Sequence, residues 1–209
     1  MIRPLKDANQ RPLLVVVTAN AIAFYLAVKT DMLLGGQWVV LAENLPEILP
    51  TGLCLVLVGV ANAQLSSDAK ARIVFLRWRD PLPGTEAFTR HAIADPRIDL
   101  MTIERNNGPL PTDPRQQNFL WYRLYQSVAD DPAVWQIHRE SLFTRDYACM
   151  SLLMLIGLGT AGLFRFPSKS TALGYIGLLI IQYLLVRCAA RNHGIGLVTT
   201  VLALKGAGK

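Results

Sequence analysis

Four long apolar segments constrain this chain more than any other feature of its sequence. They cover roughly residues 13–34, 48–64, 147–164 and 171–190, and the central part of each is almost free of charged residues. A run of about 20 apolar residues is long enough for an α-helix to cross the hydrocarbon core of a bilayer. We therefore predict an all-α, polytopic membrane protein with four transmembrane helices, arranged as two hairpins with a cytoplasmic helical insert between them.

The overall composition agrees with this prediction. Hydrophobic residues make up 52% of the 209 residues and charged residues 17%, whereas about a quarter of a typical soluble domain is charged. This composition argues against a conventional soluble enzyme and against a disordered chain. We interpret the net charge of +6 as the basic flanks of membrane helices rather than as a nucleic-acid surface, so the bilayer is the expected partner and nucleic acid is not.

The positions of Lys and Arg predict how the chain is oriented, because short basic segments stay in the cytoplasm. Basic residues precede the first apolar segment, flank the long middle section and follow the fourth segment. The turn with Arg165 and Lys169 is an exception to this pattern. We expect both termini in the cytoplasm and the chain in the cytoplasmic (inner) membrane. The predicted divisions are a first hairpin (residues 1–64), the cytoplasmic insert (65–146), a second hairpin (147–190) and a cytoplasmic amphipathic tail (191–209).

The beginning of the insert mixes apolar and basic residues. Residues 71–79 could form a helix at the membrane surface, an extension of the second span or a short strand, and we favour a helix. Arg72, Arg77 and Arg79 are predicted to contact anionic lipid headgroups, and Arg187 is predicted to reach the same surface from the fourth span. The proline-rich and asparagine-rich stretch 95–114 is expected to be an ordered loop with little regular structure.

Two capping signals predict a helical hairpin in the second half of the insert. Thr112 or Asp113 precedes Pro114, and Asp130 or Asp131 precedes Pro132, so a helix should begin at each proline. The apolar residues Leu120, Trp121, Leu124, Tyr125 and Val128 share one face of the first helix. The second helix continues without a breaker into the third span, which would couple the insert to the membrane. Candidate partner-binding residues are Trp121, Tyr125 and Trp135.

The tail contains two glycines, Gly194 and Gly196, that are expected to break or bend the helix of the fourth span. A short amphipathic helix should follow them. Three roles remain open for it: contact with the membrane, packing on the insert, or contact with another subunit.

Polar and small residues inside the spans indicate how the helices associate. Asn20, Asn62 and Gln182 are expected to bond across helices or, alternatively, to line a water-filled path. Small residues recur at four-residue spacing and favour close helix packing and a homo-oligomer; they include Ala19 and Ala23 in the first span, and Gly157 and Ala161 in the third.

The motifs that would carry phosphate, metal or acyl-transfer chemistry are absent: the sequence contains no GxxxxGK[ST], HExxH, CxxC or GxSxG. No catalytic residue, cofactor site or metal site is predicted. Our hypothesis is a non-enzymatic, oligomeric membrane protein whose insert binds a cytosolic protein partner, as an anchor, sensor or gated-pore subunit; small membrane components of bacterial defence systems have a similar architecture.

Two other functions remain open from the sequence. One is a small-solute transporter or an ion channel. The other is a membrane-embedded enzyme acting on lipid, which would need Asp80, Glu86, His91, Glu140 and Asp146 to meet at one site.

Overall fold

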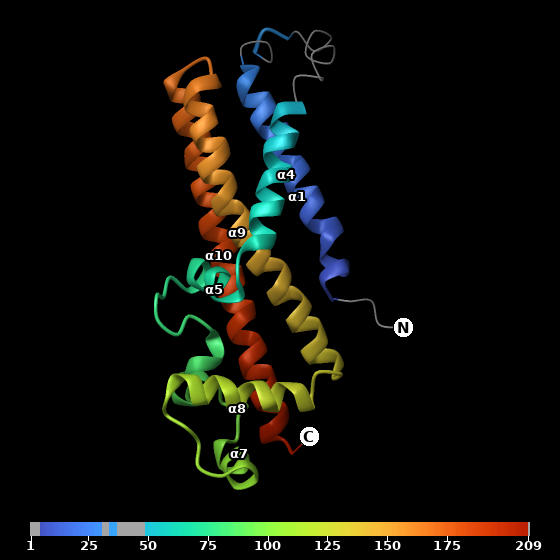
Figure 1. Ribbon diagram of the computed structural model, residues 1–209, viewed down its shortest axis with the longest axis vertical. Coiled ribbons are helices and arrows are strands. Elements are labelled where there is room, and N and C mark those ends of the chain that lie inside the picture. The colour runs from blue at the N-terminus through green and yellow to red at the C-terminus, as the bar shows by residue number, and fades with distance from the viewer. Residues whose placement is uncertain (1–4, 31–33, 37–48, 209) are drawn as a thin grey trace. The chain divides into compact units, whose positions relative to one another are not determined.

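The computed structural model describes residues 5–30, 34–36 and 49–208. All regular elements within these ranges are helical, so the predicted all-α class is confirmed (Figure 1). The elements are α1 (Leu5–Val28), α4 (Leu49–Gln64), α5 (Ser67–Phe75), η2 (Pro83–Glu86), η3 (Ala87–His91), α6 (Ala92–Ala94), α7 (Leu100–Asn107), α8 (Pro114–Ser127), α9 (Pro132–Arg165) and α10 (Lys169–Gly206).

Three described helices are long and apolar enough to cross a membrane: α1 over Asn9–Val28, α9 and α10. A fourth span is reached only if α4 and α5 are counted together as one bent span. By length and composition, these helices support the prediction of transmembrane helices.

The chain forms two compact units. Unit 1 contains Met1–Leu65 and Asp146–Val186, and unit 2 contains Ser66–Arg145 and Arg187–Lys209. Helices α9 and α10 are unbroken, and each contributes one part to each unit. The continuity of α9 from Pro132 to Arg165 agrees with the helix expected to run from the insert into the third apolar segment.

Unit 1 is a bundle of α1, α4 and the apolar parts of α9 and α10. Phe24 of α1 and Tyr175 of α10 pack with Phe166, with ring centroids 5.2 to 5.8 Å apart. Large apolar side chains also cover the outside of the bundle, which suits helices surrounded by lipid. The buried core of unit 1 consists of Ala21, Phe24, Leu55, Val58, Met150, Met154, Leu158, Tyr175 and Leu179.

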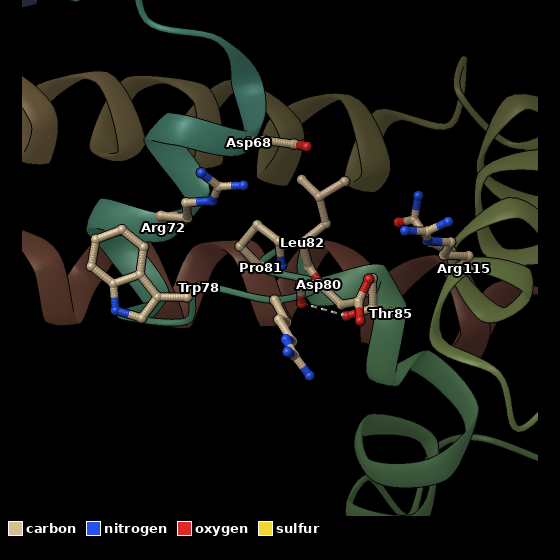
Figure 2. A pocket seen from close by; sticks show the side chains of 10 residues that line it. Asp68, Arg72, Trp78, Asp80, Pro81, Leu82, Thr85 and Arg115 are labelled. Atoms are coloured by element: carbon tan, nitrogen blue, oxygen red, sulfur yellow. Dashed lines mark hydrogen bonds between the residues drawn. The ribbon is translucent and has the colours of Figure 1, made fainter.

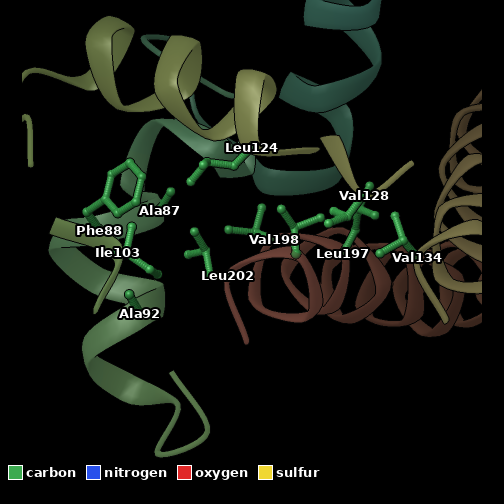
Figure 3. Packing of buried hydrophobic residues seen from close by; sticks show 11 residues of the cluster. Ala87, Phe88, Ala92, Ile103, Leu124, Val128, Val134, Leu197, Val198 and Leu202 are labelled. Atoms are coloured by element: carbon green, nitrogen blue, oxygen red, sulfur yellow. The ribbon is translucent and has the colours of Figure 1, made fainter. Parts of the chain in front are cut away.

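The core of unit 2 is assembled on the last turns of α10 (Figure 3). Leu197, Val198, Val201 and Leu202 of α10 are buried against apolar residues of the other unit 2 helices. Of the three roles left open for the tail, packing on the insert is therefore the observed one. The other members of this core are Ala87, Phe88, Ala92, Ile103, Leu124, Val128 and Val134.

The expected helix break at Gly194 and Gly196 is wrong, because α10 passes through both glycines. A Cβ atom at Gly194 would lie 3.1 Å from Cζ of Phe75, and one at Gly196 would lie 3.4 Å from Cδ1 of Ile137. The glycines therefore let neighbouring side chains approach the helix closely. The cost of glycine in a helix interior, about 1 kcal/mol, is offset by this packing.

The loop expected over residues 95–114 is also corrected, since Leu100–Asn107 forms helix α7. Asp99 caps this helix: its Oδ1 accepts hydrogen bonds from the backbone N–H groups of Met101 (3.0 Å) and Thr102 (3.2 Å). Ile103 is completely buried in the core of unit 2. The helix ends at Gly108, whose φ of 83° suits glycine.

Both predicted capping signals are confirmed. Asp113 Oδ1 accepts from the N–H groups of Arg115 (3.1 Å) and Gln116 (3.0 Å), and α8 begins at Pro114. Asp131 Oδ1 accepts from the N–H of Ala133 (2.9 Å), and α9 begins at Pro132. Leu124 and Val128 are buried in the core, as the predicted apolar face requires.

One buried amide connects α8 to the first turn of η3. Gln117 is 1% exposed, and its Oε1 accepts from the backbone N–H groups of Phe88 (3.0 Å) and Thr89 (3.2 Å). Its Nε2 donates to the carbonyl of Thr112 (2.9 Å). Gln117 thus pairs backbone groups at the start of a helix, where N–H groups have no partner within the helix itself.

Replacing Gln117 with alanine should leave the N–H groups of Phe88 and Thr89 without this acceptor. An unpaired buried donor costs roughly 1–3 kcal/mol, and only Phe88 is buried whereas Thr89 is exposed, so we expect the free energy of unfolding of unit 2 to fall by about 1–3 kcal/mol. Hydrogen exchange of these two amides in the full-length protein should accelerate. Gln126→Ala, at an exposed position of the same helix, is the control and should change neither quantity; equal effects of the two variants would contradict the role of Gln117.

Candidate functional site

The segment between α5 and η2, residues 76–82, has an unusual backbone. Leu76 and Asp80 have φ values of 54° and 45°, in the left-handed region that costs residues other than glycine roughly 1–2 kcal/mol. The N–H of Leu76 donates to the carbonyl of Arg72 (2.8 Å), and Oγ1 of Thr85 donates to the carbonyls of Asp80 (3.0 Å) and Leu82 (2.6 Å). Hydrogen bonds therefore fix the backbone at both ends of the segment.

This segment exposes two apolar side chains between arginines. Trp78 is 83% exposed and Leu76 is 62% exposed, while Arg77 and Arg79 lie on either side of the indole in sequence. The predicted helix over residues 71–79 is thus correct only as far as Phe75, where α5 ends. An exposed indole beside cations is typical of residues that lie at a membrane–water interface.

A cavity of about 490 Å³ opens beside the segment (Figure 2). Arg72 comes from α5, Arg79 from the segment itself and Arg115 from the first turn of α8. The remaining lining residues are Asp68, Trp78, Asp80, Pro81, Leu82, Thr85 and Asn118. The cavity is therefore lined by three arginines, two from neighbouring positions of one basic stretch and the third from the start of α8.

These three guanidinium groups have no ion-pair or hydrogen-bond partner among the described residues. Arg77 differs, since it pairs with Glu86 at 2.5 Å. Partial burial raises the pKa of Glu86, but hydrogen bonds and charges from Arg77 and then Arg90 outweigh burial and lower it overall. Arg72, Arg79 and Arg115 consequently offer free donors to an anion, whereas the charge of Arg77 is already neutralised.

The four basic residues predicted to reach the membrane surface thus have different environments. Arg72 and Arg79 line the cavity, and Arg77 forms an ion pair with Glu86. Arg187 lies in α10, and its Nε is buried without a hydrogen-bond partner among the described residues. Arg115 was missed, because no local pattern in the sequence indicates that the start of α8 lines the same cavity as Arg72 and Arg79.

The three aromatic residues predicted to bind a partner are half-buried. Trp121 stacks on Tyr125 with ring centroids 5.8 Å apart, and the Tyr125 hydroxyl lies 2.8 Å from Nδ1 of His138. Trp135 lies under the guanidinium of Arg139 at 5.3 Å. A Cβ atom at Gly84 would lie 2.9 Å from the Trp121 ring, so glycine is needed there. A role for these residues in partner binding stays a prediction.

Two other aromatic residues of α8 are open to solvent. Phe119 is 66% exposed and Tyr122 is 50% exposed, on the side of α8 away from Leu124. The sequence could have identified them, because residues three apart lie side by side on a helix and both fall outside its predicted apolar face.

The polar residues of unit 1 have three different environments. Nδ2 of Asn20 donates to the carbonyl of Val16 in its own helix (2.9 Å), and Nε2 of Gln182 donates across helices to the hydroxyl of Tyr147 (3.1 Å). Oδ1 of Asn62 is buried without a partner among the described residues. Gln182 therefore makes an interhelical bond, whereas the bond of Asn20 stays within α1.

The small residues also differ in environment. A Cβ atom at Gly157 would lie 3.7 Å from Sγ of Cys54, and Ala23 and Ala161 pack against the core. Ala19 is exposed on α1.

Among the acidic residues considered for an enzyme, Asp80, Glu86 and Glu140 have different neighbours. Asp80 and Glu86 line a second cavity of about 420 Å³, and Glu140 lies 4.0 Å from His193. Burial lowers the pKa of His91, against the opposing charge of Glu86. The described residues contain no group of His, Cys, Asp and Glu that could hold a metal ion. No protein-family model, curated protein or solved structure matches this chain.

The backbone of the exposed segment leads to a stability prediction. Replacing Leu76 with glycine should relieve the left-handed strain, and an exposed leucine loses little packing, so we expect the free energy of unfolding to rise by up to about 1 kcal/mol. Thermal unfolding in detergent measures the change. The matched control is Leu82→Gly, because the φ of Leu82 is −70° and glycine should destabilise that position; destabilisation by Leu76→Gly would contradict the assigned strain.

Proposed function

We propose that this chain is a non-enzymatic, oligomeric integral membrane protein that couples a cytosolic protein partner to the membrane. In this proposal α1, α4, α9 and α10 cross the cytoplasmic membrane as two hairpins, and unit 2 is the cytoplasmic module that binds the partner. Both termini lie in the cytoplasm. One observation carries the proposal: α9 and α10 each contribute to the core of unit 2 and to the apolar bundle of unit 1.

The same two helices supply side chains to both cores. Val134 of α9 is buried in unit 2, and Met154 of the same helix is buried in unit 1. Leu179 of α10 is buried in unit 1, and Val198 is buried in unit 2. Helices are stiff elements, so a displacement produced by a bound partner can pass along them to the membrane bundle.

The composition of α4 and α5 supports four spans. Helix α4 has 16 residues and is about 24 Å long, slightly short for a hydrocarbon core of about 30 Å. Helix α5 carries Asp68, Lys70 and Arg72 within nine residues. These charges favour a span formed by α4 alone, with α5 at the cytoplasmic surface, because small mismatches between helix and bilayer are tolerated at modest cost.

An oligomer is supported by small residues that remain open on the bundle. Ala19 of α1 is exposed, and a Cβ atom at Gly59, Gly174 or Gly177 would meet nothing within 4 Å among the described residues. Small surface residues allow helices from another copy to approach closely in lipid.

The exposed side of α8 is the surface that we assign to the partner. Phe119 and Tyr122 present aromatic rings there between Arg115 and Arg123. Aromatic residues and arginine are the residue types enriched in protein interfaces. Trp121 and Tyr125 hold the same helix against the core and thereby fix the position of this surface.

Two observations weigh against the alternatives. The side-chain amides of Asn20 and Gln182 donate to protein groups, whereas Oδ1 of Asn62 has no partner among the described residues and is the main support for a transporter or channel. For the enzyme alternative, the neighbour found for Glu140 is His193 at 4.0 Å, and no hydrogen bond or ion pair joins it to Asp80 among the described residues.

The topology is tested by labelling single cysteines with a membrane-impermeant maleimide in a variant that lacks Cys54, Cys149 and Cys188. We expect Arg105→Cys in α7 to react only after the membrane is permeabilised. We expect Ser168→Cys, between α9 and α10, to react in intact spheroplasts. Reaction of Arg105→Cys from outside would contradict the proposal.

The partner surface is tested in the same cells by a photocrosslinking amino acid at position 119 or 122. We expect a discrete adduct with a cytosolic protein, lost when the other of these two positions is changed to alanine. The amino acid at position 101, where Met101 is also exposed, is the control and should give no such adduct. Equal adducts at 101 and 119 would contradict the assigned surface.

A further inference from the structure

We infer that the 490 Å³ cavity between α5, residues 76–82 and the start of α8 binds the headgroup of a monoanionic phospholipid. This inference rests on the proposed function, which places unit 2 at the inner face of the membrane. It goes beyond general attraction between arginines and anionic lipid, because it assigns one cavity, one class of headgroup and the role of Arg115.

The first support is the set of free guanidinium groups. Arg72, Arg79 and Arg115 are exposed and unpaired among the described residues, and all three line the cavity. Guanidinium groups bind phosphate oxygens through paired, charge-assisted hydrogen bonds. Two other arginines of unit 2 are not free in this way: Arg77 pairs with Glu86, and Arg97 pairs with Asp95 at 2.6 Å.

The position of Arg115 is a second support. It lies in the first turn of α8, where the helix dipole disfavours a positive charge. Its backbone N–H donates to the capping Asp113, and its side chain makes no hydrogen bond or ion pair within the part of the chain that the structure describes. Stabilisation of the helix does not account for an arginine at this position, whereas binding of an anionic ligand in the adjacent cavity does.

The two carboxylates of the cavity limit the kind of anion. Asp68 and Asp80 oppose the three guanidinium groups, so the lining carries an excess of one positive charge. This excess matches one phosphodiester and disfavours a multiply charged phosphate. The carboxylates and the side-chain amide of Asn118 can accept hydrogen bonds from hydroxyl groups. A phosphodiester that carries a hydroxylated group, as in phosphatidylglycerol, satisfies both sets of residues.

The surroundings of the cavity favour a lipid over a soluble phosphate. Trp78 lines the cavity and is 83% exposed, and Leu76 is exposed two residues before it. A soluble ligand does not require such apolar groups beside the cavity, whereas acyl chains would cover them. Arg72 follows the last residue of α4, Gln64, by only eight residues, which keeps this part of the chain near the end of the predicted second span.

The test measures lipid binding to the full-length protein in detergent by native mass spectrometry. Phosphatidylglycerol and phosphatidylethanolamine are titrated separately, and glycerophosphoglycerol without acyl chains and inorganic phosphate are the soluble probes. The variants are Arg115→Gln and, as a matched control on the same helix, Arg123→Gln. Both remove one exposed charge, but only Arg115 lines this cavity.

We expect wild-type protein to bind phosphatidylglycerol more tightly than phosphatidylethanolamine. Arg115→Gln should weaken the tightest phosphatidylglycerol site roughly three- to tenfold, as expected for the loss of a charge-assisted hydrogen bond at an exposed site, and Arg123→Gln should stay within about twofold of wild type. Equal effects of the two variants, or equal affinity for the two lipids, would overturn the inference. Soluble probes that bind as tightly as the lipid would also overturn it, in favour of a soluble phosphate.

The outcome is independent of the topology test. If Arg105→Cys is labelled only after permeabilisation and the lipid preference is absent, the headgroup site fails and the proposed function stands. If Arg105→Cys is labelled from outside, the proposed function fails whatever lipid is bound.

Discussion

The structure depends on the requirement that backbone N–H and C=O groups in hydrocarbon be paired within their own helix. A helix of about 20 residues meets this requirement across a bilayer. Helices α9 and α10 have 34 and 38 residues, or about 51 and 57 Å of helix, which exceeds what crossing requires. The excess length is used in unit 2, whose core would lose Leu197, Val198, Val201 and Leu202 without the end of α10. Unit 2 therefore cannot be separated from the spans without losing its central helix.

Close approach between elements depends on a few residues in unit 2. Gly194 and Gly196 admit Phe75 and Ile137 to α10, and Gly84 admits the ring of Trp121. Gln117 supplies the hydrogen bonds that the first turn of η3 lacks. With α8 held in this way, one side of the helix is buried, while Phe119, Tyr122 and Arg115 remain exposed. The packing of unit 2 thus determines which side chains of α8 are exposed.

Local features of the structure could be predicted from sequence because their causes are local. The apolar segments give the helices of unit 1, and an aspartate before a proline gives the starts of α8 and α9. Helix α7 was missed because Pro96, Asn106, Gly108 and Pro109 suggest a loop, whereas Asp99 caps the helix and the burial of Ile103 stabilises it. A cap can be recognised locally, but burial depends on the whole unit.

The candidate site was predictable only in part, because some of its residues are brought together by tertiary packing rather than by neighbouring positions in the sequence. Arg72 and Arg79 belong to a visible basic stretch, so their grouping follows from the chain itself. That Arg77 is neutralised by Glu86 and that Arg115 joins the cavity are consequences of tertiary packing. The glycines of α10 could not be interpreted from local sequence either. Glycine in a sequence suggests a helix break, but in the folded protein Gly194 and Gly196 lie within the helix and allow other side chains to pack closely against it.

The central claim is that α9 is one continuous helix from unit 2 into the membrane bundle, and hydrogen exchange tests it most directly. In full-length protein reconstituted in lipid nanodiscs, amide exchange is followed for residues 138–152. A continuous helix predicts slow exchange at every amide of this stretch, because each N–H is bonded to the carbonyl four residues earlier. A group of rapidly exchanging amides around Arg145 would show a flexible joint and would contradict the coupling of unit 2 to the spans.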